Sequence, residues 1–260
     1  MKRILFQFFA ILFFYSPSAY PNESEKIEIE YLIRPPYFIS NNNRGDVSDG
    51  EIYHIIVKIF NNAKIPFELK KAPLIRTIQS IKENKIKVCS PSSFKTKERE
   101  EFAIFSKPLF QDKKTVIIIR NNDDSINKFN KTDDFLKQNE LKLLVKIGFS
   151  YGTYIDEKVF NFKKISLSET KQQEAINVIF TSNDNNLMFQ DILTKKADFM
   201  FIGRNEAEYL LNINPEFNKK LKIKDLADVP NGEKRYLMCS KIVGNKIIEK
   251  INKEIDKLIK

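Results

Sequence analysis

Arg99 is the residue of this chain whose type and setting most strongly raise the question of ligand chemistry. It stands in the segment KTKEREEFAIFSKPLF (95–110), among three glutamates and directly before an apolar stretch. A planar guanidinium can donate two parallel hydrogen bonds to a carboxylate. It can also pair with neighbouring glutamates on an exposed helix, where each pair contributes less than about 1 kcal/mol. From these residues alone, both roles remain open.

His54 is the only histidine, and it lies in the helical pattern EIYHIIVKIF. A histidine can act as a base or bind a metal ion. However, no second histidine and no cysteine or carboxylate cluster accompanies it at the spacing of metal ligands. We therefore expect a structural or surface histidine, no metal site and no cofactor.

Cys89 and Cys239 are the two cysteines. In an exported chain such a pair indicates a disulfide, whereas in a cytosolic chain two buried thiols would be more usual. The two alternatives depend on whether the chain leaves the cytoplasm.

The first residues have the pattern of a secretory signal. Lys2 and Arg3 precede an apolar run of 12 residues, and the small-residue segment 16–19 follows it. That run is too short to span a bilayer, which needs roughly 20 residues. The pattern predicts a signal peptide over residues 1–20, cleavage near Ser18 or Ala19 and a periplasmic mature protein. The alternative is a retained amphipathic or membrane anchor.

The net charge is +10, and +8 without Lys2 and Arg3. Such a charge invites a nucleic-acid interpretation. Yet lysines are interleaved with acidic residues along the whole chain, without a dense basic tract. We interpret the lysines as a solvated surface and expect no nucleic-acid partner.

Short apolar runs alternate with helical patterns, which is typical of parallel sheets flanked by helices. A β-α-β-α-β order is predicted twice, in residues 27–118 and 143–203, and a final strand and helix can belong to either lobe. The predicted helix that begins near Glu51 has Asp49 as its N-cap. The polar segment 121–134, after the strand at 115–120, is the best linker candidate. The elements expected in order are strands in 26–33, 66–69, 86–90, 115–120, 141–147, 163–168, 197–203 and 236–241, and helices over 51–63, 74–84, after 154, and over 185–196, 205–212 and 244–260.

Several segments together resemble a known family. They are RPPYF (34–38), DGEIYHIIVKIF (49–60), KTKEREEFAIFSKPLF (95–110), IGFSYGT (147–153), KKADFMFIGRNEAEYLL (195–211) and CSKIVGNKIIEKINKEI (239–255). In order and rough spacing they are similar to the bacterial extracellular solute-binding proteins of family 3, the periplasmic receptors of polar amino acid ABC importers. Thr-x-x-Arg followed by Phe-Ser-x-Pro is the most characteristic part.

The resemblance implies an α/β fold of the two-lobe periplasmic binding protein type 2 class (Venus-flytrap), with two hinge crossovers. Lobe 1 would comprise residues 21–118 and 228–260, and lobe 2 residues 119–227. A small ligand would bind between the lobes, and closure would present it to an inner-membrane ABC permease. Receptors of this kind usually work as monomers.

The resemblance also assigns site residues. Arg99 would hold the carboxylate of the ligand, and Ser92, Ser93 and Phe94 would contribute donors beside it. Tyr37 would stack over an apolar part of the ligand, unless it belongs to the core.

In lobe 2, Gly152 and Thr153 open a helix whose free N–H groups can receive an anion, unless they form an ordinary cap. Where amino-acid-binding members carry an aspartate for the ligand's ammonium, this chain has Gly203 and Arg204, with Glu206 nearby. A standard L-amino acid is therefore a doubtful ligand. Arg34 and Arg76 are weaker anion-site candidates.

For the cysteines, the resemblance places the strands of Cys89 and Cys239 side by side, so a disulfide fits. Two other function classes stay open beside a receptor without catalytic residues. One is a periplasmic enzyme of the same fold, resembling cyclohexadienyl dehydratase, with Glu206, Asp198 and His54 as the nominees for acid or base. The other is a ligand-sensing accessory protein.

Overall fold

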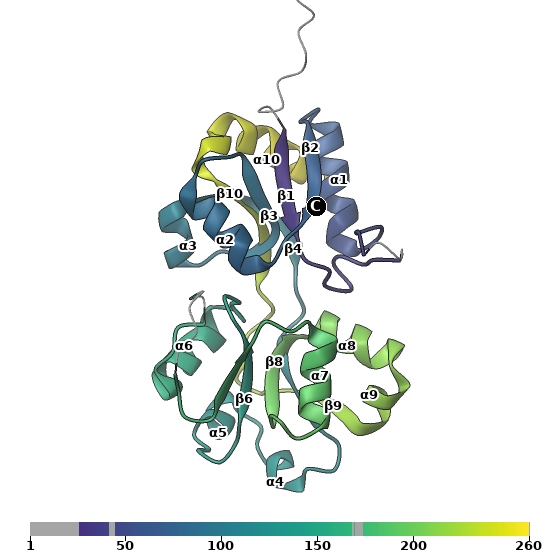
Figure 1. Cartoon of the computed structure of the whole chain (residues 1–260), viewed down its shortest axis with the longest axis vertical. Coiled ribbons are helices and arrows are strands. Elements are labelled where there is room, and N and C mark those ends of the chain that lie inside the picture. The colour runs from purple at the N-terminus through teal and green to yellow at the C-terminus, as the bar shows by residue number, and fades with distance from the viewer. Residues whose placement is uncertain (1–25, 42–44, 168, 170–173, 260) are drawn as a thin grey trace, which may run out of the picture.

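Two five-stranded sheets, each flanked by helices, divide the chain into two lobes, and two chain segments cross between them (Figure 1). The computed structural model of the 260-residue chain describes residues 26–41, 45–167, 169 and 174–259. The signal peptide predicted over 1–20 lies outside the described residues. Within the described part of the chain, no helix is long and apolar enough to cross a membrane.

The first sheet has the order β2-β1-β3-β10-β4, in which β10 runs antiparallel to both of its neighbours. Its strands are β1 (Ile27–Tyr31), β2 (Phe67–Lys71), β3 (Val88–Phe94), β4 (Ala103–Gln111) and β10 (Lys234–Ser240). Its helices are α1 (Glu51–Asn62), α2 (Leu74–Glu83), α3 (Lys97–Phe102), the short 3-10 helix η2 (Lys241–Val243) and α10 (Asn245–Leu258).

Alternation along β1 determines what each face of the first sheet buries. Ile27, Ile29 and Tyr31 pack with apolar residues of α1 and α10 in one core cluster. Successive side chains of a strand point to opposite faces, so Glu28 and Glu30 face the other side. The C-terminal strand β10 and helix α10 thus lie with the first lobe.

The second sheet has the order β7-β6-β8-β5-β9, with β5 antiparallel to β8 and β9. Its strands are β5 (Thr115–Arg120), β6 (Leu143–Lys146), β7 (Val178–Thr181), β8 (Phe199–Gly203) and β9 (Leu221–Lys224). Its helices are α4 (Asp124–Asn127), α5 (Thr132–Leu136), α6 (Thr153–Lys163), α7 (Asn185–Leu193), α8 (Arg204–Ile213) and α9 (Pro215–Lys220).

The central residues of β5 and the residues of β8 before Gly203 are apolar because both faces of this sheet are covered. Ile117 and Phe201 belong to one core cluster, and their neighbours Val116 and Ile202 belong to another on the opposite face. Both sheets are mixed, whereas the alternating pattern predicted parallel sheets.

Two local expectations differ from the structure. The strand expected over 163–168 does not form: α6 reaches Lys163, Lys164 ends it in the left-handed conformation, and Ile165 and Leu167 are buried by packing alone. The neighbouring edge strand is β7 instead. Gly50, not Asp49, holds the N-cap position of α1. Asp49 instead accepts from the Gly50 backbone and from His54.

The polar segment 121–134 is not a linker between the lobes. It contains α4 and α5, whose residues Ile126 and Phe135 are buried in the second lobe. The chain changes sheets earlier, between Gln111 and Thr115, so β5 lies wholly in the second sheet. The lobe boundary expected at residue 118 therefore falls inside that strand.

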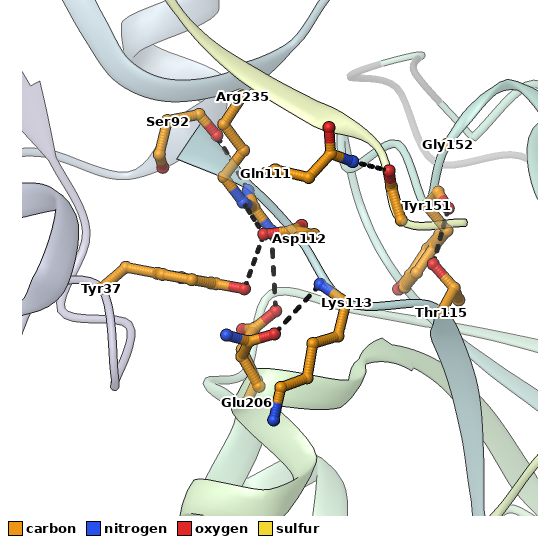
Figure 2. Close-up of polar contacts among 12 residues, drawn as sticks. Tyr37, Ser92, Gln111, Asp112, Lys113, Thr115, Tyr151, Gly152, Glu206 and Arg235 are labelled. Carbon is orange, nitrogen blue, oxygen red and sulfur yellow. Dashed lines mark hydrogen bonds and ion pairs between the residues drawn. The ribbon is translucent and has the colours of Figure 1, made fainter. Parts of the chain in front are cut away.

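A buried ion pair joins the two segments that cross between the lobes (Figure 2). Asp112 follows β4 in the first crossing, and Arg235 lies in β10, directly after the second. Arg235 Nε donates to Asp112 Oδ1 at 2.8 Å, and Arg235 Nη2 lies 2.7 Å from Asp112 Oδ2. The backbone N–H of Asp112 also donates to the Glu233 carbonyl at 3.0 Å. The two crossings are thus fixed to each other.

Side chains and a backbone carbonyl around this pair make further hydrogen bonds and ring contacts with it. The Tyr37 hydroxyl donates to Asp112 at 2.9 Å, and burial raises the pKa of Tyr37, so the phenol stays neutral. Arg235 also donates to the Ser92 carbonyl and lies over the Tyr37 and Phe94 rings, 4.5 and 4.6 Å from their centroids. Burial disfavours the charged form, but the carboxylates of Asp112 and Glu206 raise the pKa of Arg235. The guanidinium stays charged.

Cys89 of β3 and Cys239 of β10 are opposed in the antiparallel ladder and form a disulfide. It joins residues 150 positions apart and links the middle of the first sheet to the returning C-terminal strand. Closing so long a loop removes much of the conformational freedom of the unfolded chain.

We expect the double substitution of Cys89 and Cys239 by alanine to lower the free energy of unfolding by about 2–5 kcal/mol. Urea denaturation of the oxidised protein and the variant measures the difference. Two free thiols in the unreduced protein by mass spectrometry would contradict the disulfide.

We expect Asp112→Asn to lower the free energy of unfolding by about 3–5 kcal/mol, because it leaves the buried Arg235 guanidinium without its carboxylate. Asp256→Asn is a matched control, since Asp256 pairs with Lys107 where both side chains are about half exposed. That surface pair contributes at most about 1 kcal/mol. An equal loss of unfolding free energy for the two variants in urea denaturation would contradict the role of the ion pair between Asp112 and Arg235, the hinge pair.

Candidate functional site

Two adjoining cavities lie where the lobes meet. The first is lined mainly by the first lobe, from the end of β1, the start of α2 and β3, and it is completed by Phe149 and Ser150 of the second lobe. The second is lined mainly by β6, β8 and the loop after β6. The two cavities share these lining residues: Arg34, Phe94, Phe149, Ser150 and Arg235. They form one continuous region between the lobes.

Arg99 lies in this region and not on the surface. Its helix α3 begins after Thr96, whose hydroxyl accepts from the Arg99 backbone, and the side chain is buried and lines the first cavity. Arg99 Nη1 donates to the Phe94 carbonyl at 3.0 Å in its own lobe. Nη2 donates to the Gly148 carbonyl at 3.2 Å in the other lobe.

No carboxylate of the described residues forms an ion pair with Arg99. Neighbouring Glu100 pairs with Lys95 instead. Burial lowers the pKa of Arg99, and Asp156 partly offsets this effect. A buried guanidinium hydrogen-bonded to carbonyls retains donors and an uncompensated charge for an anion.

The serines predicted around Arg99 lie in the same cavity. Ser92, Ser93 and Phe94 belong to the end of β3 and line it together with Ser90. The Ser93 hydroxyl donates to the Ser90 hydroxyl at 2.9 Å, and both residues are buried. Hydroxyl and backbone groups are thus placed beside the Arg99 guanidinium.

Glu206 is fully buried near the start of α8, directly below the hinge (Figure 2). It accepts hydrogen bonds from Arg34 Nε and Nη2 at 2.6 and 2.7 Å and from Asn185 Nδ2 at 2.7 Å. Arg235 Nη2 lies 3.9 Å away. A Cβ at Gly203 would lie 3.1 Å from Glu206 Oε2, so glycine leaves space for this carboxylate. The Glu206 carboxylate is thus already bound by Arg34 of the first lobe.

Lys146 adds a second cation without a carboxylate partner among the described residues. It lines the second cavity, with its amine 4.8 Å from the centroid of the Phe149 ring. The Arg34 guanidinium also lies 4.8 Å from that centroid. Burial, followed by the charge of Arg34, lowers the pKa of Lys146 to about 8.

Other residues predicted for the site are engaged elsewhere. Tyr37 bonds to Asp112 and lines neither cavity. Arg204 pairs with Asp225, and Arg204 Nη1 lies 3.6 Å from Glu208. The Thr153 N–H donates to Glu233 at 2.9 Å, and Gly152 lines a separate small cavity beside the second crossing.

Two nominees for acid or base also lie away from the cavities. The His54 side chain is mostly exposed and bonds to Asp49. Asp198 pairs with Arg120. Within the described ranges, no group of residues could hold a metal ion.

Sequence reasoning missed Asp112, Lys146 and Arg235 and ranked Arg34 low. Arg235 and Asp112 are 123 positions apart, so nothing local marks them as a pair. Arg34 carried one signal, its place directly after the first strand and before the paired prolines, where a strand end meets the cleft.

Similar solved structures identify the fold. No protein-family model and no curated protein matches the chain. An ancestral arginine-binding protein bound to arginine is 17% identical, with a TM-score of 0.69 over 90% of this chain and 92% of that one. Holo ArgBP from T. maritima is 18% identical, with a TM-score of 0.68 over 91% of each chain. The GluR0 ligand-binding core from Nostoc punctiforme, in complex with L-glutamate, is 20% identical, with a TM-score of 0.64 over 89% and 92%. The chain therefore has the α/β, two-lobe periplasmic binding protein type 2 fold.

Proposed function

We propose that this protein is a periplasmic solute-binding protein that captures a small ligand with an anionic group between its lobes for an inner-membrane ABC importer. Arg99 carries the proposal. It is a buried guanidinium without a carboxylate partner among the described residues, it lines the cavity between the lobes, and it hydrogen-bonds to both of them. The amino acids bound by solved structures of the same fold support a small ligand.

The charges around the cavities favour an anion. Arg34 and Arg235 are neutralised by Glu206 and Asp112, whereas Arg99 and Lys146 have no such partner among the described residues. In a buried site, a carboxylate on Arg99 forms charge-assisted hydrogen bonds that are stronger than those to the Phe94 and Gly148 carbonyls. Ser92, Ser93 and the backbone at Phe94 supply further donors in our proposal, and Gly203 lines the second-lobe side.

Closure follows from contacts that a ligand makes with both lobes. A ligand shifts the equilibrium between open and closed forms only by its difference in affinity for them. An anion bound to Arg99 in the first lobe lies against Phe149 and Ser150 of the second, so those contacts exist only when the lobes meet. The hinge pair keeps the crossings fixed while the lobes move.

We infer binding and not catalysis. General acid–base chemistry needs a titratable group within reach of the substrate, and the three acid or base candidates named from the sequence are engaged elsewhere. Glu206 is held by Arg34 and Asn185, Asp198 by Arg120, and His54 lies at the surface. Periplasmic location after removal of residues 1–20 and a monomeric state complete the proposal.

A thermal-shift screen of the mature protein with L-amino acids, dicarboxylates, aromatic acids and peptidoglycan fragments tests this function. A ligand at a hundredfold its Kd stabilises the protein by about 2.7 kcal/mol. We expect Arg99→Ala, and also Arg99→Lys, which cannot donate two parallel bonds, to lose the shift relative to their own ligand-free melting temperatures. Arg76→Ala, at an exposed arginine, is the control. An unchanged shift in the Arg99 variants would overturn the proposed role of Arg99.

The binding of such an anion should weaken as the pH rises. Lys146 is charged below its pKa of about 8 and neutral above it, so its attraction for the anion is present at pH 7 and lost at pH 9. We expect calorimetry to give a Kd up to about tenfold higher at pH 9, equivalent to about 1.4 kcal/mol. Lys146→Met should remove the dependence and Lys142→Met, at an exposed neighbour, should retain it. A pH-independent Kd in the unmodified protein would refute the participation of Lys146.

A further inference from the structure

Glu30, in β1, is a buried carboxylate whose Oε2 atom has no hydrogen-bond partner. The residue is 3% exposed. Because Ile29 and Tyr31 face the core, Glu30 faces the opposite side of the sheet, where it lines the first cavity together with Thr77, Ser90 and Arg99. Glu30 has no role in the proposed function.

A buried carboxylate oxygen without a hydrogen-bond partner has an energetic cost. A carboxylate transferred from water to a protein interior costs several kcal/mol unless paired ions or hydrogen bonds replace its hydration. Glu28, two residues earlier on the same face, shows the ordinary solution: it is partly exposed and accepts from Lys70 at 2.8 Å. Buried polar groups that lack partners are concentrated at functional sites.

A ligand's cationic group would not find a free acceptor at Glu206. That carboxylate accepts two hydrogen bonds from Arg34 and one from Asn185 where the lobes meet. The other charged residues that line the first cavity are the arginines Arg34, Arg99 and Arg235. Glu30 is therefore the carboxylate that this cavity offers to a cation.

We propose that Glu30 binds the ammonium group of the ligand while Arg99 binds its carboxylate, so that the ligand is a small zwitterion held at both charges by the first lobe. This inference rests on the proposed function and names its ligand class. The second lobe then contributes closure contacts but no carboxylate for the ammonium, because Glu206 is bound to Arg34.

Matched pairs of compounds test the inference. The probes are L-glutamate with glutarate, L-norvaline with pentanoate, and 5-aminopentanoate with pentanoate, applied to the full mature protein in thermal-shift and calorimetric titrations. We expect at least one amine-bearing member to bind at least about tenfold more tightly than its partner without the amine. Glu30→Gln should abolish that preference, and Glu28→Gln should retain it.

Equal binding of both members in every pair would overturn the role of Glu30 and leave the proposed anion-binding function intact. If none of the compounds binds, the result contradicts both the role of Glu30 and the proposed anion-binding function for ligands of this class.

A measurement without ligand adds an independent test. Glu30→Met should raise the melting temperature by about 2–4 °C, because it removes a buried carboxylate oxygen that has no hydrogen-bond partner. A lower melting temperature would show that Glu30 stabilises the fold and would overturn the proposal.

Discussion

The ion pair between Asp112 and Arg235 is the interaction on which the arrangement of the site depends. Each residue lies beside one of the two segments that cross between the lobes, and both are buried. The same guanidinium contacts the end of β3 through the Ser92 carbonyl and approaches Glu206 of the second lobe. The pair therefore links the crossings to the strand end beside Arg99 and to the entry of α8.

From this hinge, charges alternate in sign across the meeting point of the lobes, from Asp112 to Arg235, Glu206 and Arg34. Each of them gains a partner that offsets the cost of its burial. Arg99, Lys146 and Glu30 are the exceptions, since they have no ion-pair partner among the described residues. A site that binds a charged ligand needs such groups, and they make the ligand-free protein less stable than it could be.

Much of the fold was predictable because burial on both sides of a sheet leaves a strong pattern. The apolar runs of β5 and β8 and the amphipathic helices α1 and α10 follow from local sequence. The prediction of a strand over 163–168 was wrong. Ile165 and Leu167 alternate as in a strand, but they lie in a loop that packs on the core. Alternating apolar residues indicate that a segment is buried, but they do not show that it pairs with another strand.

The site was less predictable because its charges find partners far along the chain. Arg34 and Glu206 are 172 positions apart, and neither differs locally from a solvated surface residue. Arg204 was predicted for the site, but it turns away to Asp225, while Glu206 points to the hinge. The segment around Arg99 was informative because its motif resembled that of a known family, although composition alone left two roles open.

A crystal structure of the protein grown with a compound that shifts its melting temperature tests the central claim most directly. The account predicts density between the lobes, with the anionic group of the compound within hydrogen-bond distance of the Arg99 guanidinium and Phe149 and Ser150 closing over it. A compound bound outside the inter-lobe cavities, with Arg99 still bonded only to the Phe94 and Gly148 carbonyls, would contradict it.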